Sequence, residues 1–128
     1  YVFAIDLETN YPIPFTPPFN VFTEFGYKFK NTAYFNNSLL SASIQVVAPQ
    51  NKVARNELST PGYNLLGVSF STDLKLNSTL IKWSFRVDNI FNTKYFNHLS
   101  FYRPLGLPEA GRNFQLTLNI PIIKHFRC

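Results

Sequence analysis

Two alternating segments decide the fold: IKWSFRVDNIF at residues 81–91 and NFQLTLNIPI at residues 113–122. In both segments apolar side chains recur at nearly every second position, and polar side chains fill most of the positions between them. A period of two is typical of a β-strand, because successive side chains leave opposite faces of the pleated backbone. A long loop separates the two segments, so we predict that they form an antiparallel hairpin.

The same alternation predicts further strands upstream. The expected strands cover residues 19–29, 40–48 and 63–76, and residues 1–7 are expected to be the remains of another. Residues 8–18 contain four prolines and residues 50–61 are charged and punctuated by proline. Both segments predict loops, because proline lacks the N–H that a sheet ladder needs. Residues 30–38 predict a polar turn, and residues 77–80 predict a tight one.

The predicted connections alternate between long and short along the chain. Short turns at one end of the strands and long loops at the other are typical of an up-and-down barrel in an outer membrane. The segment 19–29 would span roughly 23–25 Å at a tilt of about 40–45°, which is close to the apolar band of such barrels. We therefore predict an all-β chain, in which about five antiparallel strands and an N-terminal stub form an up-and-down meander that is part of a transmembrane β-barrel.

The alternation alone favours a soluble β-sandwich, in which the apolar faces of the strands pack on each other. In a barrel the apolar rows would face lipid and the polar rows would line a lumen; in a sandwich the polar rows would be a solvated face. The loop asymmetry favours the barrel. The aromatic residues expected at the membrane interfaces are Tyr27, Phe29 and Trp83 at one end and Phe19 and Phe91 at the other.

Several motifs occur in the order that one protein family shows. They are YPIPFTPP at 11–18, QNKVA at 50–54, TPGY at 60–63, VDNIFNTKY at 87–95, NHLS at 97–100 and PEAGRNF at 108–114. Together with the alternating C-terminal segment, they resemble the C-terminal end of a TonB-dependent receptor, the large outer-membrane barrel of Gram-negative bacteria. The resemblance covers nearly the whole chain and favours the barrel over the sandwich.

The resemblance implies that residues 1–128 are the C-terminal strands of a receptor barrel, whose plug domain, earlier strands and TonB-binding segment lie outside this chain. The chain contains no methionine, so we expect a piece of a longer protein. The implied function is active uptake of a scarce nutrient, most often a ferric siderophore, across the outer membrane with energy from the TonB system. The implied partners are outer-membrane lipid, lipopolysaccharide, the plug domain, TonB and a small ligand such as a ferric chelate. The alternative is a soluble or secreted antiparallel β domain that binds a lipid or a glycan.

The composition argues against several other classes of protein. The formal net charge is +5, but the basic residues are dispersed rather than clustered, which argues against nucleic-acid binding. Cys128 is the single cysteine, so we expect no disulfide framework and no thiol cluster for a metal. Apolar runs fall well short of the roughly 18 residues that a membrane-spanning helix needs.

Candidate catalytic residues are scarce. Asp88, His98 and Ser100 superficially offer a hydrolase set, but the chain has no Gly-x-Ser-x-Gly elbow to expose the serine. A role in stabilising a turn is the simpler interpretation of segment 98–100. His98 and His125 are too isolated to suggest a metal site. We therefore expect no enzyme activity, no metal and no cofactor.

Basic residues predominate in the long loops. An anionic chelate or a lipopolysaccharide phosphate would be attracted to them, and arginine binds such groups through paired hydrogen bonds. The candidate contacts are Lys52, Arg55, Lys94, His98, Tyr102, Arg103 and Arg112, against the acidic Glu57 and Glu109. For each of them, ordinary loop charge is the simpler account.

The end of the chain departs from the family that it resembles. Such receptors are similar in ending on an aromatic residue, which the barrel-assembly machinery recognises. The residues expected to form this strand and signal are Phe114, Leu116, Leu118, Ile120, Ile122 and Phe126. Ile122 stands where the aromatic residue is expected, whereas Phe126 keeps the same phase beyond Pro121. We expect assembly to be impaired but not abolished, and truncation after Ile122 combined with Ile122→Phe to improve it.

Overall fold

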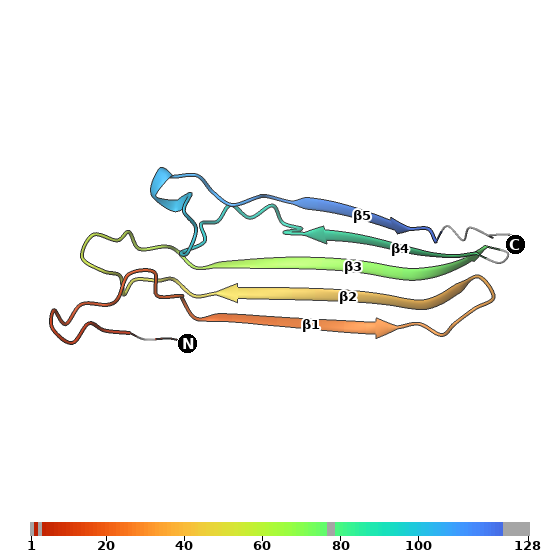
Figure 1. Cartoon of the computed structure of the whole chain (residues 1–128), viewed down its shortest axis with the longest axis horizontal. Coiled ribbons are helices and arrows are strands. Elements are labelled where there is room, and N and C mark those ends of the chain that lie inside the picture. The colour runs from red at the N-terminus through yellow and green to blue at the C-terminus, as the bar shows by residue number, and fades with distance from the viewer. Residues whose placement is uncertain (1, 3, 77–78, 122–128) are drawn as a thin grey trace, which may run out of the picture.

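The computed structural model describes residues 2, 4–76 and 79–121, which form one sheet of five antiparallel strands (Figure 1). The strands are β1 (Asn20–Lys28), β2 (Phe35–Val47), β3 (Tyr63–Leu76), β4 (Thr79–Asp88) and β5 (Asn113–Asn119), and a short 3-10 helix, η1 (Arg103–Leu105), precedes β5. Their order in the sheet is their order in the sequence. The predicted all-β meander is confirmed, and within the described residues the sheet is not closed into a barrel.

The register of the sheet brings apolar residues of all five strands to one side, which we call the apolar face. One row across the sheet consists of Tyr27, Leu40, Phe70, Phe85 and Leu116, each opposite the next on the neighbouring strand. A slip of one residue in any pair would move the apolar side chains of one strand to the other side. The alternation in the sequence therefore selects this register, and the predicted pairing of β4 with β5 is confirmed.

Aromatic rings make contacts across the strands on the apolar face. The Phe70 ring of β3 makes edge contacts with the ring of Phe29, which follows β1, and with the ring of Trp83 on β4, at centroid distances of 6.4 and 5.6 Å. Phe85 stacks on Phe114 with centroids 6.5 Å apart. Such pairs contribute about 0.5–1.5 kcal/mol each beyond the area that they bury. They therefore help to hold the strands in register.

The opposite side of the sheet, the polar face, carries hydroxyl, amide and charged side chains. Ser41, Ser69, Arg86 and Gln115 lie opposite one another from β2 to β5. Arg86 Nε lies 3.2 Å from Asp88 Oδ1 in an ion pair whose side chains are about half exposed. Water screens such a pair, so it contributes little stability. The two sides of the sheet thus differ sharply in chemistry.

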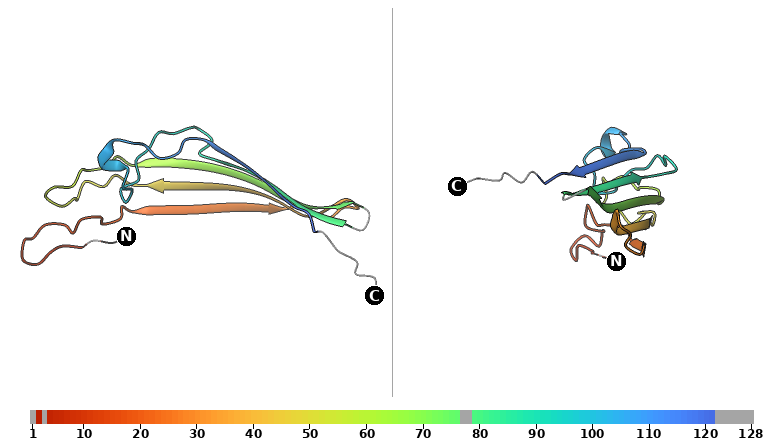
Figure 2. Two further views of the ribbon diagram at one scale, coloured as in Figure 1. Left: turned by 45° about the horizontal axis from the view of Figure 1, so that its top comes forward. Right: turned by 90° about the vertical axis from the view of Figure 1, so that its right-hand side faces the viewer.

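The sheet is a single curved layer (Figure 2). Among the described residues Val47 is the one buried hydrophobic side chain, whereas Phe25, Phe114 and Leu116 are 71%, 63% and 61% exposed. The described residues therefore do not form the packed pair of layers that the sandwich alternative requires. The apolar face needs a cover from outside the described part of the chain.

The polar turn predicted over residues 30–38 is wrong in its second half. Residues 35–38 belong to β2, where a β-bulge shifts the register with β3. Asn37 has a φ of 52°, which asparagine adopts more readily than most residues. The Ser38 hydroxyl bonds Thr72 Oγ1 over 2.7 Å, and both residues are buried. Polar side chains thus support the bulge, which is why the composition of this segment concealed the strand.

The ends of β4 and β5 also differ from the prediction. β4 ends at Asp88, because Asn89 turns the backbone with a φ of 51°. The Asn89 side chain bonds both the N–H and the carbonyl of Thr93, which holds this turn. β5 ends at Asn119, and Ile122 lies outside the described residues.

The stub predicted over residues 1–7 is not a strand in the part that the structure describes. Ile5 forms an isolated bridge with Pro12. Between them the Asp6 carboxylate accepts hydrogen bonds of 2.9 Å from the Glu8 N–H and the Thr9 hydroxyl. The Asn10 N–H donates to the Asp6 carbonyl over 2.8 Å, so the chain turns directly after the bridge.

The long connections lie together at one end of the sheet (Figure 1), which we call the loop end. The segment before β1, the β2–β3 loop (residues 48–62) and the β4–β5 loop (residues 89–112) are found there. At the opposite end residues 29–34 join β1 to β2, and β4 begins at Thr79 soon after β3 ends at Leu76. The predicted alternation of long and short connections is confirmed.

Gly62→Ala should destabilise the sheet at the loop end. A Cβ on Gly62 would lie 2.7 Å from the Val47 carbonyl oxygen and 2.9 Å from the Pro49 nitrogen, so the backbone would have to move. We expect a loss of about 1–3 kcal/mol in the free energy of unfolding, measured by urea denaturation of the full-length protein. Gly26→Ala is the control, because its Cβ would meet the flexible Leu39 side chain at 3.3 Å. Equal losses in both variants would contradict the proposed clash.

Candidate functional site

Three segments pack together at the loop end. Gln50 and Thr60 close the β2–β3 loop by exchanging backbone hydrogen bonds of 2.9 and 3.1 Å. The Gln50 side chain donates to the Thr16 carbonyl over 2.9 Å, which ties the segment before β1 to this loop. All three residues are buried. The segments are therefore packed on one another rather than extended into solvent.

Glu57 is the centre of this packing. Its Oε1 accepts the Phe15 N–H over 3.1 Å, and its Oε2 accepts the Ala54 N–H over 3.2 Å. Arg103 Nη2 donates to Oε1 over 3.1 Å, and His98 Nε2 lies 3.1 Å from the same oxygen. The Glu57 side chain is 7% exposed. One carboxylate thus connects all three segments of the loop end.

His98 is the most buried side chain of the site. Thr60 Oγ1 lies 2.9 Å from its Nδ1, and Arg103 Nη1 faces the same nitrogen. An ionised Glu57 carboxylate only accepts, so Nε2 carries the proton of the neutral ring and donates it to Glu57, while Nδ1 accepts from the Thr60 hydroxyl. Arg103 Nη1 also lies 3.4 Å from Nε2, so the guanidinium is close to both ring nitrogens. We call Glu57, Thr60, His98 and Arg103 the Glu57 cluster.

The electrostatics of the Glu57 cluster favour a neutral His98 and an ionised Glu57. Burial and the Arg103 guanidinium lower the pKa of His98, and the Glu57 carboxylate offsets them only in part. Burial acts to raise the pKa of Glu57, but the Phe15 and Ala54 N–H groups and Arg103 outweigh it, so the pKa of this carboxyl is lowered. The cluster thus holds one carboxylate and one guanidinium, with no excess charge.

The helix η1 places Arg103 in the cluster. Pro104 lies in its first turn, where the missing N–H is tolerated, and Gly106 ends it with a φ of 70°. Arg103 Nη1 donates to the Leu58 carbonyl over 2.9 Å, so the guanidinium joins the β4–β5 loop to the β2–β3 loop. Arg103 Nε is buried and has no hydrogen-bond partner among the described residues. The side chain therefore acts as a bridge between the loops.

The hydroxyl, imidazole and carboxylate of the Glu57 cluster follow the order of a hydrolase triad. In a triad the imidazole takes the proton of the hydroxyl nucleophile. Here Arg103 competes for the same His98 nitrogen, and Thr60 is 5% exposed. This geometry does not supply an activated, accessible nucleophile, so we interpret the cluster as a structural contact.

The hydrolase set considered from the sequence is not brought together. Asp88 pairs with Arg86 on β4. Ser100 Oγ accepts the Tyr102 N–H over 3.3 Å, and the Ser100 N–H donates to the Asn97 carbonyl. Ser100 therefore lies in a turn.

Asparagines shape the base of the β4–β5 loop. Asn89 and Asn92 both have positive φ, at 51° and 54°. Asn92 Oδ1 accepts the Arg112 N–H over 2.9 Å, which joins the two ends of the loop. The Tyr95 ring packs against the Tyr63 ring with centroids 4.4 Å apart. These residues therefore fix the loop on the start of β3.

The structure divides the candidate contact residues into two groups. His98 and Arg103 lie inside the Glu57 cluster and are 2% and 7% exposed. The exposed group consists of Lys52, Arg55, Lys94, Tyr102 and Arg112, from both loops. Glu57 and Thr60 were missed as members of a site. Spacing gives no signal for them, because Glu57 and Arg103 are 46 residues apart.

The residues of the C-terminal strand lie on the apolar face as far as the structure describes them. Phe114, Leu116 and Leu118 of β5 and Ile120 just after it are each more than half exposed. Ile122 and Phe126, expected to carry the assembly signal, lie outside the described residues.

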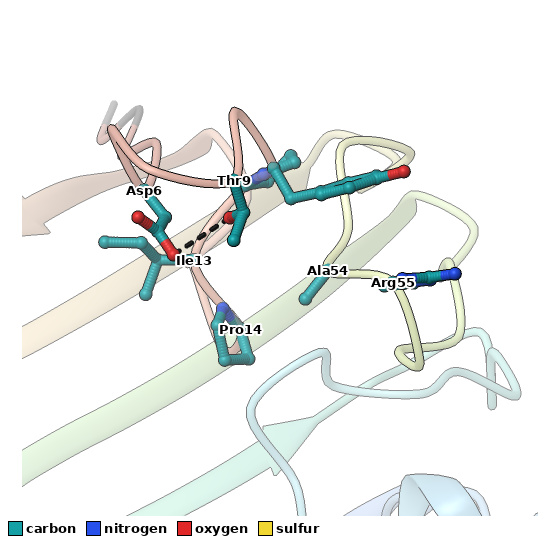
Figure 3. Close-up of a pocket in the computed structure, with 8 residues that line it drawn as sticks. Asp6, Thr9, Ile13, Pro14, Ala54 and Arg55 are labelled. Carbon is teal, nitrogen blue, oxygen red and sulfur yellow. Dashed lines mark hydrogen bonds between the residues drawn. The ribbon is translucent and has the colours of Figure 1, made fainter.

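Two hollows open at the loop end. One, of about 500 Å³, is lined by Asp6, Thr9, Tyr11, Pro12, Ile13, Pro14, Ala54 and Arg55 (Figure 3). The other, of about 470 Å³, lies beside the Glu57 cluster between Phe15, Leu58 and Pro104, and it shares Pro14, Ala54 and Arg55 with the first. Arg55 is a cation common to both. Asp6 balances it in the first hollow, whereas Arg55 and Arg103 outnumber Glu57 in the second, so an anionic group on a ligand would be attracted to the second.

A comparison with models of known protein families found no match for this chain. Among the described residues no helix is long and apolar enough to cross a membrane. No group of three or more His, Cys, Asp or Glu side chains in the same residues could hold a metal ion. The candidate site therefore rests on the geometry of the Glu57 cluster and the hollows at the loop end.

Arg103→Leu should loosen the loop end. The change leaves the Glu57 carboxylate, which is 7% exposed, without its cation. Removing one partner of a buried ion pair costs about 3–5 kcal/mol. We expect faster cleavage of the β2–β3 loop in limited proteolysis of the full-length protein. Arg112→Leu is the matched control, because Arg112 is exposed on the same loop as Arg103; equal cleavage in both variants would mean that the buried pair does not hold the loops.

Proposed function

We propose that this chain is part of the wall of an outer-membrane β-barrel, in a TonB-dependent transporter that takes up a scarce nutrient such as a ferric siderophore. The observation that carries the proposal is the apolar face, which runs across all five strands and lies in a single-layer sheet. The order of the sequence motifs supports the choice of family. The energy would come from the TonB system, through parts of the receptor outside this chain.

An exposed apolar face of this kind is unfavourable in water. Its cost is about 25 cal/mol for each Å² of apolar surface, and monomeric soluble proteins rarely expose patches larger than a few hundred Å². Phe25, Tyr27, Phe114, Leu116 and Leu118 are all more than half exposed. Lipid acyl chains would cover this face without any protein partner.

Four of the five strands have the length that a membrane requires. β1, β2, β3 and β4 contain 9, 13, 14 and 10 residues, and a strand that spans a bilayer needs about 9–11; β5 is shorter, with 7 residues. The outer edges of β1 and β5 have no partner strand among the described residues. Unpaired backbone groups are not tolerated in hydrocarbon, so further strands of a longer protein would pair at both edges.

In this arrangement the polar face would line the interior of the barrel and contact the plug domain. The loop end would face the outside, where long loops of such barrels lie. The exposed Lys52, Arg55, Lys94 and Arg112 would meet lipopolysaccharide phosphates or an anionic ferric chelate there. The hollow of about 470 Å³ that contains Arg55 and Arg103 is a candidate place for such a contact.

Fractionation and uptake by cells that produce the full-length protein test the proposal. We expect the protein in the outer-membrane fraction, detergent-dependent extraction, and ferric-chelate uptake that is lost when the protein or TonB is removed. Solubility without detergent would favour the alternative, a secreted β domain that binds a lipid or a glycan. If the protein is in the outer membrane but shows no TonB-dependent uptake, the proposed barrel would stand and the proposed transport role would be wrong.

Phe85→Arg should destabilise the full-length protein more than Ser84→Arg. Phe85 lies on the apolar face opposite Phe70 and Leu116, whereas the neighbouring Ser84 lies on the polar face. Arginine on the lipid side near the middle of the bilayer costs about 2–4 kcal/mol, and on the interior side it costs much less. Unfolding of the protein in lipid vesicles measures both costs. A cost at Ser84 equal to or above that at Phe85 would mean that the faces are assigned the wrong way round.

A further inference from the structure

We propose that the Glu57 cluster is a pH-sensitive contact, in which proton uptake by His98 releases Arg103 and separates the segments packed at the loop end. The inference goes beyond the proposed transport function and does not depend on it. It rests on the hydrogen-bond geometry of His98 and on its burial between two loops.

The geometry suits one protonation state of His98. Nδ1 faces Arg103 and the Thr60 hydroxyl, and Nε2 faces Glu57. A neutral ring with its proton on Nε2 accepts at Nδ1 and donates to Glu57, so its contacts are satisfied. A proton on Nδ1 would make the ring a cation beside the Arg103 guanidinium, whose Nη1 lies close to both ring nitrogens. The side chain is 1% exposed, so water does not screen this repulsion.

The charged groups that face His98 are Glu57 from the β2–β3 loop and Arg103 from its own loop. The segment before β1 presents a neutral group to the cluster, the Phe15 N–H that donates to Glu57. With a neutral His98 the cluster carries no net charge. With a protonated His98 it would carry one buried positive charge in excess, which is unfavourable unless the site opens to water.

Acid therefore opens the contact. The pKa of His98 lies below its ordinary value of 6.5, so the contribution of this ring to the closed state is complete above that value and is lost as the pH falls through the lowered pKa. The pKa of Glu57 also lies below its ordinary value, which is 4.5. Glu57 is thus still ionised near pH 5, and opening in that range has to come from His98.

Opening would change the surface at the loop end. Phe15 has a φ of 58°, which is strained for a bulky residue, and its N–H is bound by Glu57. Separation of the β2–β3 and β4–β5 loops would leave this bond in place but would move Arg103 and Pro104 out of the wall of the hollow of about 470 Å³. The Glu57 cluster therefore links the shape of this hollow to pH.

Distances between spin labels test the proposal. Labels on Asn56→Cys and Tyr102→Cys, both at exposed positions, report the separation of the two loops in the full-length protein with Cys128→Ser. Between about pH 8 and about pH 5, the interval in which histidine changes charge, we expect a reversible gain of a longer and broader distance population. His98→Gln keeps a donor and an acceptor but takes up no proton, so we expect its short distance to persist at both pH values.

His125→Gln is the matched control, because it removes the other histidine of the chain, and it should open in acid like the wild type. An unchanged distance in the wild type down to about pH 5 overturns the proposal. Equal opening in His98→Gln overturns it as well, because the proton acceptor would then lie elsewhere. If the His98→Gln variant does not assemble, the distance measured in the wild type at the two pH values tests the proposal without it.

Discussion

A period of two in side-chain polarity, kept in register across five strands, is the constraint on which the structure depends. Each antiparallel pair places residues directly opposite, so Val68 lies between Ala42 and Val87, and the apolar face is continuous. The described strands bury almost no hydrophobic side chain, since the sheet has a single layer. Backbone hydrogen bonds and cross-strand side-chain pairs hold the strands to each other. The sheet also needs a partner that covers its apolar face, because that face is exposed in the described part of the chain.

The loop end is held by a different interaction. Its buried side chains, such as Gln50, Thr60 and His98, are polar, and a buried carboxylate with bound N–H groups connects its segments. Glu57 alone receives donors from the segment before β1, from its own loop and from Arg103. Burial makes each of these bonds stronger than it would be in water, and it makes an unpaired partner costly. The order of the loops therefore depends on keeping the charges balanced.

The sequence predicted the strands well because their signal is local. β3 has the predicted limits, and β1 differs by one residue at each end. The prediction failed at the start of β2, where the bulge at Asn37 interrupts the alternation. The Glu57 cluster could not be predicted, since its members come from two loops without periodicity. His98 and Arg103 were singled out as exposed ligand contacts, whereas the structure buries them against Glu57.

The buried Glu57 carboxylate affects the backbone conformation at the loop end as well as the packing of its segments. Well-packed apolar residues of similar volume often stabilise a protein as much as a buried ion pair does. Apolar contacts, however, have no direction, whereas the two oxygens of Glu57 fix the positions of the Phe15 and Ala54 N–H groups. Phe15 adopts a left-handed backbone conformation that costs about 1–2 kcal/mol, and the bond to Glu57 offsets part of that cost. The conformation of the segment before β1 therefore depends on an oxygen acceptor in another loop, and an apolar substitute of similar size would not select it.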